Sequence, residues 1–155
     1  VDSVRVLSID GSVVHSFATP GLHQPFVGLP DGSIAYARWY TDYLEDITNV
    51  ARDGTATQVF DCDAWLAGVA PSQYCASNTL KRDPVTGHFL LTLYSIQTTL
   101  EIDPATGTVI RSFGNAPGSA GSLHNACFHS LHVFENRCHN SLKKRRKRLR
   151  VSGAL

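Results

Sequence analysis

Turns that open with Asp and close with Gly recur along this chain, each between two stretches rich in β-branched, aromatic and leucine residues. Asp favours such turns because its side chain bonds to the backbone two residues on, and Gly supplies the positive φ that they need. The sequence therefore predicts a series of β-hairpins, the first with a two-residue loop at Asp10-Gly11. The five turns are Asp10-Gly11, Asp31-Gly32, Asp53-Gly54, DPVTG at residues 83–87 and DPATG at residues 103–107.

The spacing of these hairpins indicates a repeat. The turns at Asp10, Asp53 and Asp103 are separated by 43 and 50 residues, and each is followed by a strand that ends near a Phe. Repeats of about 40 to 50 residues with four strands each are typical of β-propeller blades. We therefore predict an all-β fold, a β-propeller-like array of four-stranded antiparallel blades over residues 1–140. A β-sandwich is the alternative, since it is also built from a run of short strands.

The length of the chain indicates an incomplete ring. With that period, 155 residues hold about three blades, whereas a closed propeller has at least about four. Another copy of the chain would complete the ring as a homo-oligomer, or the chain is a piece of a longer protein. The chain begins at Val1 and contains no Met, which indicates either a removed leader or such a piece.

Residues 62–75 interrupt the pattern of strands. DAWLAGVA is predicted to form one short helical turn at most, because no stretch has a convincing period of about 3.6 residues. Cys62 and Cys75 are 13 residues apart and flank this loop. We predict a disulfide between them, and with it an oxidising compartment. Two free thiols in a cytosolic protein are the alternative.

The charged residues divide the chain into two regions. Residues 143–150, KKRRKRLR, hold seven of the fourteen Lys and Arg residues, so residues 1–142 carry seven basic against thirteen acidic side chains. We interpret residues 141–155 as a disordered basic tail without a dedicated role. Binding of nucleic acid or of an anionic surface through residues 143–150 is the alternative. The sequence has no run of 18 apolar residues, which predicts no membrane span.

Residues 78–114, NTLKRDPVTGHFLLTLYSIQTTLEIDPATGTVIRSFG, resemble a known family. A blade opening at Asn78, two D-P-x-T-G turns and the aromatic Phe113 near the end of the last strand resemble the arylsulfotransferase-type β-propellers. LHQPFVGLPDGSIAYA at residues 22–37 is similar to the blade opening of that family, and SLHNACFHSLHVFEN at residues 122–136 is similar but lacks the Pro-Asp-Gly turn.

This resemblance implies a secreted or periplasmic enzyme that transfers a sulfuryl group from a small aromatic sulfate to a phenol through a histidine. Blades begin beside the central channel, so the resemblance implies catalytic roles for His23 and His124 and a substrate-binding role for Asn78. Arg38 and Arg111 are implied as partners of the charged sulfate oxygens. In the alternative, His23 and His124 are ordinary polar residues at strand ends, and the two arginines are solvated. The chain is then a non-catalytic propeller segment that serves as a binding surface or scaffold.

Cys and His residues are dense between residues 124 and 139, which raises the question of a zinc site. Their spacing matches no familiar zinc-finger pattern, and the alternation of a strand sends neighbouring side chains to opposite faces. We therefore predict no metal site, and leave the state of Cys127 and Cys138 open. No cofactor is predicted, because the common nucleotide-binding, hydrolase and zinc-protease motifs do not occur in the sequence.

Overall fold

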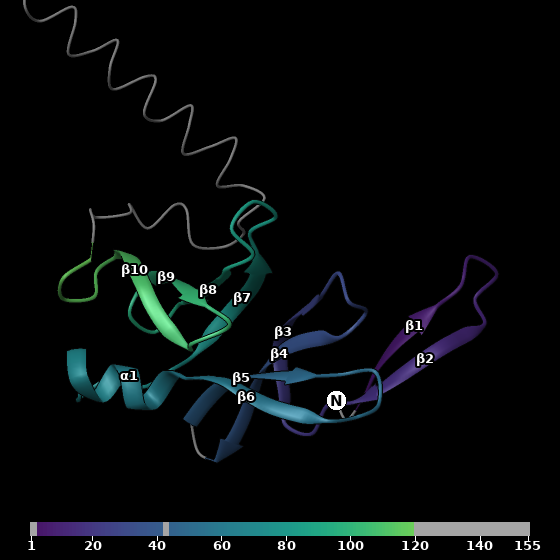
Figure 1. The fold of residues 1–155 in the computed structure, drawn as a ribbon. Helices are drawn as coiled ribbons and strands as arrows, with labels where there is room; N and C mark the ends of the chain where they lie inside the picture. Colours follow the sequence, from purple (N-terminus) through teal and green to yellow (C-terminus); the bar gives the residue numbers. More distant parts are fainter. Residues whose placement is uncertain (1–2, 42–43, 120–155) are drawn as a thin grey trace, which may run out of the picture.

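The computed structural model describes residues 3–41 and 44–119, which form ten β-strands and one α-helix (Figure 1). This part of the chain is mostly β and its strands pair antiparallel, as predicted. The elements are β1 Ser3–Leu7, β2 Val13–Ala18, β3 Leu22–Gly28, β4 Ile34–Thr41, β5 Leu44–Val50, β6 Ala56–Asp61, α1 Cys62–Val69, β7 Ser77–Arg82, β8 Phe89–Leu93, β9 Thr98–Asp103 and β10 Thr108–Gly114.

Each predicted turn joins two antiparallel strands, so all five hairpins are confirmed. The Asp side chain of every turn accepts a hydrogen bond from the backbone N–H two residues further on, at 2.8 to 3.0 Å. The loop at Asp10 differs from the prediction. A backbone hydrogen bond of 2.9 Å from Ser8 to Ser12 closes it around three residues. Only Gly11 among these has a positive φ, whereas the type I′ two-residue loop that Asp-Gly favours needs it at both positions.

The strands form three sheets in chain order: β1-β2, then the meander β3-β4-β5-β6, then the meander β7-β8-β9-β10. Successive sheets pack face to face. Ile34 and Tyr36 of β4 enter a core with Phe17 of β2, whereas Ala35 between them enters a second core with Leu91 of β8. This alternation follows from the two-residue period of a strand. β3 lies beside β7, so the first strands of the two meanders are neighbours (Figure 1).

The described part of the chain holds fewer complete units than expected. It has two four-stranded sheets and one two-stranded sheet, in place of about three four-stranded blades. β1 and β2 correspond to the last two strands of each meander, because these pairs contain the turns at Asp10, Asp53 and Asp103. The strand orders of the described sheets are open, so none of them closes into a barrel.

α1 is longer than the single turn that the sequence predicted. Its eight residues follow Asp61, whose side chain caps the helix by accepting a hydrogen bond from the Ala64 N–H at 2.9 Å. Cys62 and Leu66 are buried and Val69 packs beside them, while the helix contacts β5. The prediction was wrong because a stretch of eight residues is too short to give a clear helical period.

Cys62 and Cys75 form the predicted disulfide, with their Cα atoms 6.2 Å apart. Both side chains are fully buried in the core shared by the two meanders. The bond therefore fixes the start of α1 to the segment that leads into β7. In residues 3–41 and 44–119, no helix is long and apolar enough to cross a membrane.

Candidate functional site

His23 and Asn78 occupy equivalent places in the two meanders. Each is the second residue of the first strand, His23 in β3 and Asn78 in β7, and these strands are neighbours. Both residues are partly buried. The structure thus brings two of the predicted site residues to the region where the two four-stranded sheets meet.

The imidazole of His23 stacks on the indole of Trp39, with ring centroids 3.6 Å apart and an angle of 16° between the planes. Its Nδ1 atom is buried and has no hydrogen-bond partner among the described residues. A buried polar atom without a partner costs roughly 1 to 3 kcal/mol of stability. Buried polar atoms are rarely left in that state, so this nitrogen is one of the few exceptions among the described residues.

Glu45 connects this region to β7. Its side chain is fully buried and accepts hydrogen bonds from three neutral donors. The Trp39 Nε1–H donates to Oε2 at 3.3 Å, the Ser77 N–H donates to Oε2 at 2.8 Å, and the Ser77 hydroxyl donates to Oε1. A fully buried carboxyl group that lost these donors would be left unsatisfied, at a cost in free energy. Glu45 therefore holds the start of β7, next to Asn78, against the meander that carries His23.

Asp63 of α1 is a second acidic residue beside Glu45. Its Oδ2 atom accepts a hydrogen bond from the Glu45 backbone N–H at 2.7 Å. Burial raises the pKa of the Asp63 carboxyl above its ordinary value, and the nearby carboxylates of Asp61 and Asp46 raise the pKa further. The hydrogen bond from Glu45 acts in the opposite direction without reversing the shift.

Arg38 is engaged by a carboxylate of its own sheet. Its guanidinium forms an ion pair with Asp46, which lies directly opposite on β5 and has a fully buried side chain. Asp46 also accepts hydrogen bonds from the Thr48 hydroxyl at 2.8 Å and the Gln58 amide at 3.3 Å. The hydrogen bonds to Asp46 raise the pKa of the Arg38 guanidinium above its ordinary value. The charge of Arg38 is therefore already balanced within the protein.

Arg111 lies away from the other predicted residues. It is on β10, the strand at the opposite edge of the sheet from β7 and Asn78. Its Nε–H donates to Glu101, which is 4% exposed and also contacts the His88 Nδ1 at 2.8 Å. The hydrogen bonds from His88 and from Arg111 lower the pKa of the Glu101 carboxyl. The structure thus gives Arg111 a partner in its own sheet and does not bring it to His23.

Sequence reasoning missed Trp39, Glu45 and Ser77, which connect the predicted residues His23 and Asn78. A signal was present in the strand LEDITNV of β5. Glu45 shares the parity of Ile47, which is a buried core residue, so alternation places a carboxylate on an inward face. Such a residue needs hydrogen-bond donors, which identifies it as a structural or functional centre.

Several predicted residues lie outside the described part of the chain. These are His124, Cys127 and Cys138, together with the basic residues 143–150. In residues 3–41 and 44–119, no group of three or more His, Cys, Asp and Glu side chains is placed to hold a metal ion.

Comparisons of the chain with models of known protein families, with curated proteins and with solved structures give no match.

Proposed function

We propose that the chain is part of a β-propeller of the arylsulfotransferase type, in which His23 carries a sulfuryl group between phenolic compounds once the ring is complete. The observation that carries this proposal is the equivalent placement of His23 and Asn78 on neighbouring first strands. Blades of a propeller begin beside the central channel, so such residues would face a shared channel. The buried disulfide supports export to an oxidising compartment.

A repeated Phe supports the propeller. Phe17, Phe60 and Phe113 are each the last residue but one of the final strand of their sheet. Phe17 packs between the first and second sheets, and Phe60 packs between the second and third. Each thus fills the space between its own sheet and the next, as blades packed around an axis require. By the same rule, Phe113 is at the position where a fourth sheet would pack.

The chemistry proposed for His23 has two steps. An imidazole nitrogen attacks the sulfur of an aryl sulfate, so that an N–S bond forms while the S–O bond to the ring breaks and a phenolate leaves. The oxygen of the acceptor phenol then attacks the same sulfur, the N–S bond breaks, and the phenol gives its proton to solvent. Because Nδ1 of His23 is buried, Nε2 is the nitrogen that a substrate would approach.

Both steps need donors that stabilise the sulfate oxygens. Arg38 is paired with Asp46, and Arg111 is paired with Glu101. Under this proposal the cationic groups therefore come from the rest of the ring. His124, which lies outside the described residues, is one candidate for that role.

Transfer by fractions of the purified chain tests the proposal. Light scattering assigns the mass of each fraction, and nitrophenolate released from 4-nitrophenyl sulfate in the presence of phenol reports transfer. His23→Ala is expected to lower the rate by at least about 100-fold, because removal of a covalent nucleophile removes the pathway. His15→Ala is the matched control, since His15 is also a strand histidine against an aromatic ring. Equal rates for the two variants, or no transfer in any fraction, would overturn the proposal.

A non-catalytic binding or scaffold module is the second candidate. Two observations favour it: both predicted arginines are neutralised by carboxylates of their own sheet, and the region beside His23 contains the buried Glu45. An anionic substrate is disfavoured there unless cations arrive from elsewhere. This function predicts a folded chain that shows no transfer in any oligomeric fraction and no histidine-dependent activity.

A further inference from the structure

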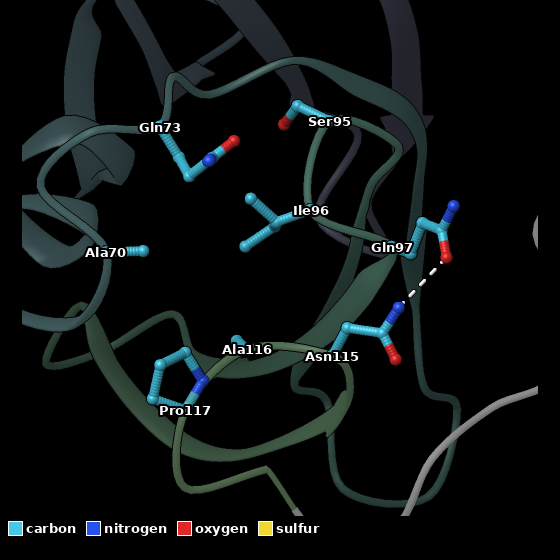
Figure 2. A pocket seen from close by; sticks show the side chains of 8 residues that line it. All are labelled: Ala70, Gln73, Ser95, Ile96, Gln97, Asn115, Ala116 and Pro117. Atoms are coloured by element: carbon cyan, nitrogen blue, oxygen red, sulfur yellow. Dashed lines mark hydrogen bonds between the residues drawn. The ribbon is translucent and has the colours of Figure 1, made fainter.

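A pocket of about 340 Å³ lies where three segments meet at one end of the second meander. They are the segment between α1 and β7, the turn between β8 and β9, and the residues that follow β10 (Figure 2). The size is at the lower end of the range for small-molecule sites, roughly 300 to 1,000 Å³. It suits a single ring better than a larger ligand.

The described residues that line this pocket are uncharged. Its polar side chains are three amides and one hydroxyl, those of Gln73, Gln97, Asn115 and Ser95. The remaining lining residues are apolar, and Figure 2 shows the side chain of Ile96 directed into the pocket. Because no described Asp, Glu, Lys, Arg or His lines it, an ionised ligand would lose its hydration without gaining a counter-charge from this part of the chain.

The rim of the pocket is held in one arrangement. Gln97 has a φ of +50°, a left-handed conformation that non-glycine residues rarely adopt. The Asn115 backbone N–H donates to the Gln97 carbonyl at 3.2 Å, and the Asn115 amide donates to Gln97 Oε1 at 2.9 Å (Figure 2). The Ser95 hydroxyl donates to the Tyr74 carbonyl at 2.8 Å. Strained residues fixed in this way occur preferentially at ligand sites.

We propose that this pocket binds a neutral ring compound that carries a hydroxyl group. The apolar wall, with Ile96 and Pro117, would contact the face of the ring. The amides of Gln97 and Asn115 keep one donor and one acceptor group beyond their mutual hydrogen bond, and these would pair with the hydroxyl. A phenol and a sugar share this chemistry. The proposal goes beyond sulfuryl transfer, because it makes no use of His23.

Binding of three small probes tests the pocket: phenol, methyl glucoside and phenyl sulfate, each titrated into the full chain by NMR. At neutral pH phenol is uncharged, whereas phenyl sulfate differs from it by an anionic group. We expect saturable binding of phenol or methyl glucoside, and at least about tenfold weaker binding of phenyl sulfate. The neutral probe that binds more tightly shows whether the natural ligand is a phenol or a sugar. Saturable binding of neither, or phenyl sulfate binding as tightly as the better one, would overturn the proposal.

Two variants and a control connect the binding to the pocket. Gln97→Gly removes an amide while keeping the backbone favourable, because Gly readily adopts a φ of +50°; we expect at least fivefold weaker binding of the neutral probe. Gln24→Ala, an exposed residue on β3 outside the pocket, is the control. Gln73→Lys adds a cation to the lining and is expected to strengthen phenyl sulfate binding relative to phenol. Unchanged affinities in Gln97→Gly or an unchanged ratio in Gln73→Lys would place the binding elsewhere. His23→Ala should leave these affinities unaltered, so this proposal and that of transfer fail separately.

Discussion

Breaking the disulfide is expected to destabilise the fold by an amount that follows from the length of the loop it closes. Cys62 and Cys75 are 13 residues apart, and closing a loop of that size restricts the unfolded chain by about 3 kcal/mol at 25 °C. Reduction of the Cys62–Cys75 bond removes this restriction and leaves both sulfur atoms in the core. Cys62→Ala/Cys75→Ala also removes two fully buried sulfur atoms. Each adds roughly 1 kcal/mol, for a total of about 5 kcal/mol.

Urea unfolding monitored by the fluorescence of Trp39 and Trp65 measures both losses. With a slope of about 1 to 3 kcal/mol per molar urea, a loss of 3 kcal/mol lowers the unfolding midpoint by about 1 to 3 M. The double alanine variant with and without reductant is the control, because it measures any effect of the reductant elsewhere, including at Cys127 and Cys138. A fall of less than about 0.3 M on reduction would refute the entropic reasoning. It would mean that the reduced unfolded chain already keeps residues 62 and 75 close together, so that closing the loop restricts it little.

Three further perturbations test the site, a turn and the response to acid. Ser77→Ala removes a hydrogen bond to the buried carboxylate of Glu45, and we expect a loss of about 1.5 to 3 kcal/mol in urea unfolding. A loss below about 0.5 kcal/mol would show that the hydroxyl contributes no net stability. Gly107→Ala places a Cβ 2.4 Å from a backbone carbonyl oxygen of β6, whereas at Gly54, which also has a positive φ, nothing lies within 4 Å. Gly107→Ala should therefore cost at least about 1 kcal/mol more than Gly54→Ala, and equal losses would contradict this contact between the sheets. Hydrogen bonds from Ser8 and Ser12 lower the pKa of the Asp10 carboxyl from 3.8 to about 2. A lowered pKa stabilises the fold above pH 3.8 and the benefit is lost as the pH falls towards 2, so the melting temperature of Asp10→Asn should vary less with pH in this window than that of the natural chain.

The sequence predicted the hairpins because each turn has its own local chemistry. An Asp that bonds to the backbone two residues on, followed by a Gly with positive φ, needs no distant partner. The Cys62–Cys75 disulfide was predictable for a similar reason, since both residues flank one short loop. α1 was underestimated, because a helix of eight residues is specified mainly by the core that it packs against.

The partners of the predicted arginines depend on strand register, which local signals do not determine. Arg38 lies directly opposite Asp46, and Arg111 lies directly opposite Glu101, so each is paired across one hairpin. The register of both hairpins contains an irregularity near the arginine. Counting outward from the turn residues therefore gives the wrong opposite residue. The contact between Glu45 and Ser77 joins two sheets and requires their packing to be known.

The charges around His23 determine what a completed site would have to supply. His23 stacks on Trp39, Trp39 donates to Glu45, and the Glu45 backbone donates to Asp63. Among the described residues, Arg38 forms an ion pair with Asp46, and the donors to the Glu45 side chain are neutral. A sulfuryl group on His23 would add negative oxygens to this acidic region, and like charges repel. Under the proposed function, the rest of the ring must therefore bring more positive charge to the channel than the sulfate carries. A scaffold needs no added positive charge. The two functions therefore differ in one measurable respect: only the transferase gains activity when the ring is completed.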